Sequence, residues 1–302
     1  MPGPGVDALL GQLRCLQGRT YTVEDLKGGL TNRNLKVVTS DSTLVVRMSD
    51  GNSDLLAIDR EDEYHNSVAA AASGVGAPVV EYRPDLSALV VGFIDARTCS
   101  RRDLTDSSCL ERVVSACRRL HRGTPFRNRF DMFRLQPFYL KVAQDHAFRV
   151  PERYLDFMPQ LERIKVALAA TDTGTVPCHN DLLAENCLDD GIQVWLIDYE
   201  YSGNNDPCFE LGNLWSESDL TLEVLEEIVT CYYGRFSPQK AARARLQGLM
   251  SKYGWTLWAA IQDGAAQLDF DFWSWGLEKY DRAVAEFTGP EFEGLLDLAA
   301  GR

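Results

Sequence analysis

Residues 178–217 constrain the fold of this sequence more than any other segment, because they combine polar side chains with a tight turn and a short apolar strand. Asp181 is followed five residues later by Asn186, and Asp198 comes directly after the apolar run Val194–Ile197. An Asp-Asp-Gly turn divides the stretch between Asn186 and Asp198, so we expect a β-hairpin there. A hairpin returns the chain to its starting edge and would bring two carboxylates and one amide together. Such a set can combine a general base with oxygen ligands for Mg²⁺.

The overall composition is that of an ordinary globular protein. Of the 302 residues, 45% are hydrophobic and 25% are charged, which excludes disordered and fibrous classes. The net charge of −13 argues against nucleic acid or an anionic membrane as partner and favours a small cationic ligand.

Membrane and disulfide signals are missing from the sequence. The longest apolar run, Ala88–Ile94, is far shorter than the ~20 residues of a bilayer-spanning helix, and the N-terminal residues have no signal-peptide pattern. None of the eight cysteines forms a C-x-x-C pair. We therefore expect a cytoplasmic protein with reduced cysteines and no stable membrane insertion.

The sequence changes character near residue 95. Before it, short β-type runs surround one Ala-rich helical stretch, Asp59–Ser73, and after residue 103 helical periodicity dominates. The β-type runs are Tyr21–Val23, Asn34–Thr39, Leu44–Met48, Pro78–Tyr82 and Ala88–Ile94, and the main helical stretches are Cys109–His121, Pro159–Ala170, Thr221–Tyr233 and much of 238–287. We predict an α+β, bilobal fold with a β-rich N-terminal lobe, 1–94, and a mainly helical lobe, 95–302. Chains of this kind bind their ligand in the cleft between the lobes.

The order His179-x-Asp181-x-x-x-x-Asn186, followed by Asp198, matches the catalytic loop and magnesium-binding Asp of protein kinases. The chemistry explains the spacing. One carboxylate meets the attacking hydroxyl, while an amide oxygen and a second carboxylate hold Mg²⁺ against the phosphates. We expect His179 to orient the loop rather than take part in the chemistry.

The N-terminal part holds features that match this interpretation. The turn KGGLTNRNLK, residues 27–36, can let backbone N–H groups approach phosphates. Arg47, in the strand LVVRM, stands where kinases carry the lysine that contacts the α- and β-phosphates. An acid at the start of the following helix would orient Arg47; Glu63 is our choice and Glu61 the alternative.

The chain resembles the choline/ethanolamine kinase branch of the aminoglycoside-phosphotransferase-like kinases. The residues that carry the resemblance are His179-Asn180-Asp181, Asn186, the string Leu196–Gly203 (LIDYEYSG), Phe209–Asn213 (FELGN) and Glu217. It spans roughly residues 20–290 and is strongest at 178–217. It implies a protein-kinase-like bilobal fold, ATP and Mg²⁺ as cofactors, and a small amino alcohol as substrate.

The resemblance also implies roles for individual residues. Asp181 corresponds to the catalytic base, Asn186 and Asp198 to metal ligands, and Glu200 to a contact of metal-bound water. Glu185 stands where the family often has Gly, and we interpret it as the marker of a branch. Adenine is expected near Val90–Ile94, bound through backbone hydrogen bonds. The full set of expected nucleotide contacts is Gly28, Gly29, Thr31, Asn32, Asn34, Arg47, Glu63, Val90 and Phe93.

All six tryptophans lie after residue 194, and Trp255 and Trp258 share one helix face at i, i+3. A quaternary ammonium donates no hydrogen bonds and is bound by aromatic faces and carboxylates. By the resemblance, the substrate site consists of Asp181, Tyr201, Glu217, Trp255, Trp258 and Trp275. The alternative is that the tryptophan pair belongs to the core.

We therefore predict an ATP- and Mg²⁺-dependent kinase of a small cationic amino alcohol, with choline ranked first. An ethanolamine, aminoglycoside or thiamine kinase of the same fold is the first alternative. A catalytically silent protein that binds a quaternary amine is the second. His121, at the end of its helix, is expected to support the catalytic loop. The sequence gives no prediction of the oligomeric state.

Overall fold

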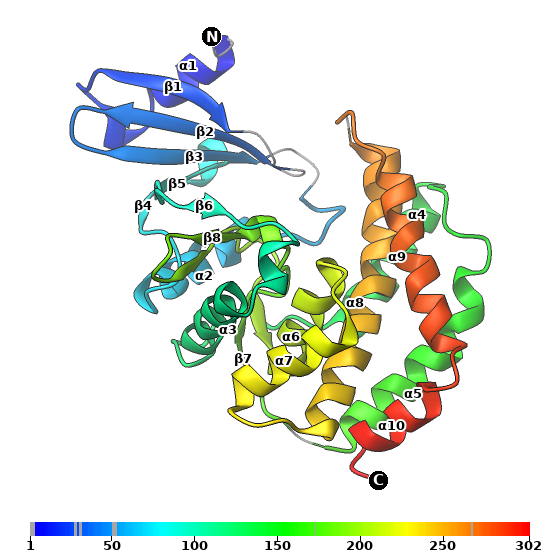
Figure 1. Ribbon diagram of the computed structural model, residues 1–302. Helices are drawn as coiled ribbons and strands as arrows, with labels where there is room; N and C mark the ends of the chain where they lie inside the picture. Colours follow the sequence, from blue (N-terminus) through cyan, green and yellow to red (C-terminus); the bar gives the residue numbers. More distant parts are fainter. Residues whose placement is uncertain (1–3, 27–28, 30–31, 50–52, 172, 267) are drawn as a thin grey trace.

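The computed structural model describes residues 4–26, 29, 32–49, 53–171, 173–266 and 268–302, and it has the predicted α+β, bilobal architecture. Figure 1 shows the N-terminal sheet at the upper left and the helical part below and to the right. The sheet has five antiparallel strands in the order β1-β2-β3-β5-β4. These strands are β1 Tyr21–Leu26, β2 Asn32–Thr39, β3 Thr43–Ser49, β4 Val79–Arg83 and β5 Ala88–Gly92.

One face of this sheet is covered by the N-terminal helix α1 (Pro4–Leu10) and the short 3₁₀ helix η1 (Arg14–Leu16). Alternate residues of β2 and β3 point into this small core, as period-2 strands require. The core consists of Val6, Leu10, Leu13, Leu16, Leu35, Val37, Leu44, Val46 and Val90. The sequence predicted the five strands but not α1.

Helix α2 (Arg60–Ala72) connects the two lobes. The Asp59 side chain caps it by accepting from the backbone N–H groups of Glu61 and Asp62 at 2.9 and 3.0 Å. Ala70 and Val75 are fully buried, and they pack with the helical lobe rather than with the small core of the sheet. The first lobe is therefore attached to the second through α2 as well as through the chain that follows β5.

The helical lobe is organised around the long helix α8, which packs on α4, α6, α9 and α10. Its helices are α3 Ser107–His121, α4 Met132–Asp145, α5 Met158–Ala169, α6 Pro207–Glu217, α7 Leu222–Tyr233, α8 Pro238–Ala265, α9 Phe272–Phe287 and α10 Phe292–Ala299. Its strands are β6 Arg97–Thr98, β7 Val176–Cys178, β8 Cys187–Asp189, β9 Val194–Leu196 and β10 Gly203–Asn205. Short 3₁₀ turns are η2 Pro84–Leu86, η3 Asp103–Thr105, η4 Tyr154–Phe157 and η5 Ala184–Asn186.

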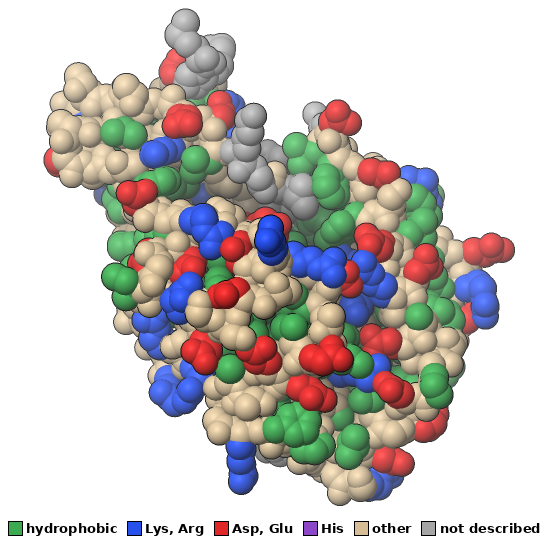
Figure 2. Space-filling view, in the orientation of Figure 1, with side chains coloured by type: hydrophobic (Ala, Val, Ile, Leu, Met, Phe, Trp, Pro, Cys, Tyr) green, Lys and Arg blue, Asp and Glu red, His purple; other side chains and the backbone are tan. Residues whose placement is uncertain are grey.

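The surface carries charged side chains of both signs, and the cysteines are unpaired. Figure 2 shows Lys and Arg side chains interspersed with Asp and Glu on the face in view. All eight cysteines are free thiols. Among the helices in the described part of the chain, none combines the length and apolarity needed to cross a bilayer.

Candidate active site

The hairpin expected between Asn186 and Asp198 is present, formed by the antiparallel pair β8 and β9. Beyond the paired residues, the Ile197 N–H donates to the Asn186 carbonyl at 3.0 Å. The Asn186 side chain donates to the Asp181 carbonyl oxygen at 2.8 Å. The hairpin therefore brings Asp181, Asn186 and Asp198 to the same edge, as their spacing predicts.

Two residues of this edge have left-handed backbone conformations, Asn180 with φ +67° and Asp198 with φ +73°. Apart from glycine, Asn and Asp adopt this conformation most readily, because their short polar side chains can support it with local hydrogen bonds. The Asn180 amide supplies part of that support, because its Nδ2 donates to the carbonyls of Cys178, Tyr201 and Gly203 at 3.1–3.2 Å.

Helix α6 supports the catalytic loop from below. The fully buried Glu210 carboxylate accepts from the backbone N–H groups of His179 and Asn180 at 2.8 and 2.7 Å. One turn further along α6, Asn213 Oδ1 accepts from the Leu182 N–H at 2.6 Å. Glu210, Asn213 and Glu217 are spaced i, i+3, i+7, so one face of the helix presents all three polar groups to the site.

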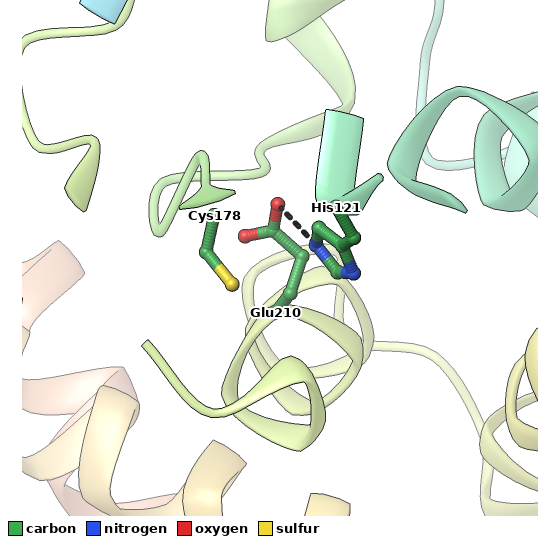
Figure 3. A group of neighbouring side chains, drawn as sticks. All are labelled: His121, Cys178 and Glu210. Atoms are coloured by element: carbon green, nitrogen blue, oxygen red, sulfur yellow. Dashed lines mark hydrogen bonds and ion pairs between the residues drawn. The ribbon is translucent and has the colours of Figure 1, made fainter. Parts of the chain in front are cut away.

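Behind the loop, His121 contacts the same carboxylate. Figure 3 shows His121, Cys178 and Glu210 side by side, with His121 Nε2 3.4 Å from Glu210 Oε1. His121 Nδ1 lies 2.7 Å from the Tyr232 hydroxyl. Burial raises the pKa of the Cys178 thiol well above its ordinary value, which keeps it protonated. Because Glu210 already accepts two backbone N–H groups, we interpret this cluster as support for the loop, not as a metal site.

His179 takes no direct part in the proposed chemistry in this geometry. Its ring Nε2 lies 2.7 Å from the Ile197 carbonyl, and its Nδ1 accepts from the Asp181 N–H at 3.3 Å. The ring is fully buried. These contacts tie the catalytic loop to the end of β9, the orienting role expected from the sequence.

Arg47 lies at the centre of a charged network between the lobes. Its guanidinium is 2.7 Å from Asp198 Oδ1, 3.3 Å from Glu63 and 3.6 Å from Glu200. Arg60, the first residue of α2, is 2.7 Å from Glu63 and 3.0 Å from Glu200. Arg47 and the acid on the following helix thus meet, and that acid is Glu63.

The site has an excess of carboxylates. Loss of hydration raises the pKa of Asp181 well above its ordinary value, and the charges of Glu217, Asp198 and Glu200 raise it further. Burial and the charge of Asp198 raise the pKa of Glu200 to about 7, although Arg47 lies nearby. Carboxylate and amide oxygens are the ligand types that Mg²⁺ prefers, so Asn186, Asp198 and Glu200 fit a magnesium site by their chemistry.

Comparisons with known proteins identify the family. The sequence profile of the choline/ethanolamine kinases matches residues 23–231. The chain belongs to the choline/ethanolamine kinase family. Protein LicA of Haemophilus influenzae is 28% identical over 271 residues, covering 85% of this chain and 77% of LicA. A probable ethanolamine kinase A of Dictyostelium discoideum is 25% identical over 299 residues, covering 86% of this chain and 84% of its own length.

A solved member of the family has the same fold. The choline/ethanolamine kinase family protein of Mesorhizobium loti superimposes with a TM-score of 0.85 at 30% identity, covering 98% of both chains. The chain described here is therefore a small-molecule kinase of the protein-kinase-like fold. Its preference between choline and ethanolamine is a separate question, which depends on the substrate end of the cleft.

The aromatic residues expected in the substrate site of this kinase form one connected group. The Trp258 indole N–H donates to the Tyr201 hydroxyl at 2.7 Å, and the Trp255 ring meets Tyr201 edge-on with centroids 4.9 Å apart. Trp258 and Trp275 are edge-on at 5.7 Å. Trp255 and Trp258 are only 3% and 6% exposed and belong to the main core of the helical lobe. Trp275 is partly exposed and, with Glu217, lines a cavity of about 190 Å³.

The structure describes most, but not all, of the residues expected to contact the nucleotide. Gly28 and Thr31 lie outside the described residues. Asn32 Nδ2 donates to Glu200 at 2.9 Å, which links the first lobe to the proposed metal site. A Cβ on Gly29 would meet the Asn32 carbonyl, so this position requires glycine for a close backbone approach. The Asn34 Oδ1 is buried without a hydrogen-bond partner among the described residues.

The position of Val90 corrects one expectation. Val90 is fully buried in the small core, and it pairs with Val46 on one side and Glu81 on the other. As a residue of an inner strand, it cannot offer free backbone groups to adenine. Phe93 is partly exposed, but its N–H already donates to the Thr43 carbonyl at 3.0 Å. The backbone of Val90 and the N–H of Phe93 are therefore not available to adenine, and the remaining nucleotide contacts stay predictions.

Three supporting residues received no role from the sequence, namely Glu210, Asn213 and Arg60. A signal for the first two was available, because the polar positions 210, 213 and 217 repeat at helical spacing in an otherwise apolar segment. No comparable signal existed for Arg60, whose partner Glu200 lies 140 residues away in the chain.

Proposed function

We propose that this kinase transfers the γ-phosphate of ATP to the hydroxyl of a small cationic amino alcohol, with choline as the preferred substrate. The observation that carries the proposal is that the charges of Asp198, Glu200 and Glu217 all act on the Asp181 carboxyl, while Glu217 also lines a cavity with the partly exposed Trp275. Such a site attracts Mg²⁺ at one end and an organic cation at the other.

In the proposed mechanism, Asp181 accepts the proton of the substrate hydroxyl as that oxygen attacks phosphorus in line. Asn186, Asp198 and Glu200 would hold Mg²⁺, which supplies charge neutralisation for the phosphates. Arg47 contacts the phosphates and is itself oriented by Glu63. Most of the rate enhancement would come from positioning and electrostatic stabilisation.

The preference for choline rests on the chemistry of the cavity wall. A quaternary ammonium gains from an aromatic face and a carboxylate, whereas a primary ammonium requires hydrogen-bond acceptors for three N–H groups. In this cavity Trp275 supplies the aromatic face and Glu217 the carboxylate. By the family resemblance we expect Tyr201, Trp255 and Trp258 to contribute further aromatic contacts. With ATP as donor, we place the enzyme in the cytoplasm, and the free thiols suit a reducing compartment.

The test is steady-state ADP release with Mg-ATP and a panel of acceptors: choline, ethanolamine, its mono- and dimethyl derivatives, thiamine and an aminoglycoside. We expect kcat/KM to rise with each N-methyl group and to peak at choline. A maximum at ethanolamine or at another acceptor would refute the choline preference and leave the kinase assignment intact.

A substitution at Asp181 tests its assignment as the catalytic base. Asp181→Asn should lower kcat by ~10²–10⁴, the usual contribution of general acid–base catalysis, and leave choline binding in place. Asp145→Asn is the matched control, because Asp145 is an exposed carboxylate on α4 paired with Lys141. Turnover by Asp181→Asn at the wild-type rate would show that another group is the base. Choline binding without turnover in the wild type would favour the non-catalytic alternative.

A further inference from the structure

Among the described residues, four cationic side chains line the cavity beside Trp275, namely Arg101, Lys252, Lys279 and Arg282, and Lys279 is the one that lies over the Trp275 ring. The Lys279 ammonium lies 4.1 Å from the centre of the Trp275 ring and forms an ion pair with Glu217. Its side chain is 10% exposed, and the Glu217 side chain is 1% exposed. An aromatic face and a buried carboxylate are the two groups that a bound ammonium substrate requires.

Lys279 also lies within electrostatic reach of the proposed base. The charges of Glu217 and Lys279 both act on the Asp181 carboxyl, in opposite directions. Glu217 is fixed from behind, because the Ser251 hydroxyl lies 3.4 Å from its Oε1 and also accepts from Asn213, the residue that holds the catalytic loop. The Glu217 carboxylate is therefore held in place, whereas Lys279 carries its charge on a flexible stem.

We propose that Lys279 is an internal competitor of the substrate: its ammonium occupies the cation subsite formed by Trp275 and Glu217 in the free enzyme and leaves when the substrate cation binds. This inference rests on the proposed function and adds a specificity-determining residue to it. Glu185, the exposed carboxylate of the catalytic loop, lines the same cavity and offers the released ammonium a new partner.

The physical consequence is a reduced apparent affinity. A ligand that binds only the state with Lys279 displaced has its dissociation constant divided by the fraction of that state. Lys279 also excludes other cations from the subsite. In the absence of substrate it keeps the buried Glu217 carboxylate paired. An isolated buried charge would be strongly destabilising.

Neutral variants test the proposal. Lys279→Met and Lys279→Gln should lower the choline KM about 5- to 20-fold with little change in kcat, because one cation–π contact and one ion pair no longer compete with substrate. Lys279→Arg keeps a cation in the subsite and should leave KM at or above the wild-type value. Lys240→Met is the control, since Lys240 also faces an aromatic ring, that of Tyr233, outside this cavity. A choline KM that stays constant or rises in both neutral variants would overturn the proposal.

A measurement without turnover separates this inference from the proposed function. Choline should raise the melting temperature of Lys279→Met more than that of the wild type, because the ligand restores a partner to Glu217. Tetramethylammonium, which has no hydroxyl, should do the same. If choline is not phosphorylated by the wild type but tetramethylammonium stabilises the Met variant preferentially, the proposed substrate fails and the competitor role stands. Equal stabilisation of the two proteins by tetramethylammonium would refute the competitor role.

Discussion

Replacement of Glu210 tests how the catalytic loop is supported. Its carboxylate accepts two backbone N–H groups, those of His179 and Asn180, and both residues are fully buried. A hydrogen bond to a charged group contributes about 1.5–3 kcal/mol, so Glu210→Ala should lose about 3–6 kcal/mol of unfolding free energy. Since whole proteins are stable by only about 5–15 kcal/mol, the alanine variant should be close to unfolded at 37 °C.

Glu210→Gln is the more informative variant. It keeps one oxygen acceptor but places an NH₂ group against the second backbone N–H, so we expect a loss of about 2–4 kcal/mol. Because the loop that carries Asp181 would shift, kcat should fall while the choline KM changes little. Urea denaturation followed by tryptophan fluorescence gives the stability, and ADP release gives the rate.

The control for this series is Glu293→Gln, which removes an exposed carboxylate on α10 paired with Arg163. Surface ion pairs contribute little, so its urea midpoint should match the wild type. The reasoning is refuted if Glu210→Gln unfolds at the wild-type midpoint and keeps the wild-type kcat.

Glu210 also makes the stability of the folded protein depend on pH, in a direction that follows from its pKa. Burial raises the pKa of Glu210, but the hydrogen bond and charge of His121, with the His179 N–H, bring it below its ordinary value of 4.5. The unfolded state therefore binds this proton more tightly than the folded state, so the stabilisation is present above pH 4.5 and is lost as pH falls below it. The stability difference between wild type and Glu210→Gln should narrow on acidification below pH 4.5, whereas a constant difference would contradict the argument.

Two further variants address helix packing and the aromatic group. Gly212→Ala should be strongly destabilising, because its Cβ would overlap the Ala244 carbonyl where α6 crosses α8. Gly294→Ala has open space around its Cβ and should gain about 0.5–1 kcal/mol of unfolding free energy. The urea midpoints of the two variants test both predictions. Trp258→Phe removes the donor to Tyr201 and should lower stability by about 1 kcal/mol and raise the choline KM. Loss of stability with an unchanged KM would make Trp258 a core residue only.

The sequence predicted the parts of the fold that depend on local patterns. The strands of the first lobe, helix α2 and the β8–β9 hairpin follow from period-2 or period-3.6 patterning and turn residues. Helix α4 was missed because Pro137 lies in its interior and reads as a helix breaker. Its packing against α8 outweighs that local cost. Helix α6 was missed for a similar reason, because Gly212 lowers helix propensity but permits the close crossing with α8.

The role of the tryptophan pair could not be decided from the sequence. Trp255 and Trp258 do share a helix, as predicted, but nearly every residue of α8 from Ala242 to Gln262 is buried. A helix buried on all sides has no polar face from which periodicity could tell core from cleft. The role of this pair in substrate binding therefore stays a prediction.

The pairing of acidic and basic side chains in the site could not be predicted from any local sequence pattern. Asp198 and Glu200 are accompanied by Arg47 and Arg60, and Glu217 by Lys279, so the clustered acids near Asp181 meet cations that the protein itself provides. Like charges this close would otherwise repel strongly in a partly buried site. Binding of Mg-ATP and of a cationic substrate introduces new cations at both ends of this cluster. The existing pairs must then rearrange, and the enzyme's affinity for each ligand reflects the difference between the new pairings and the old.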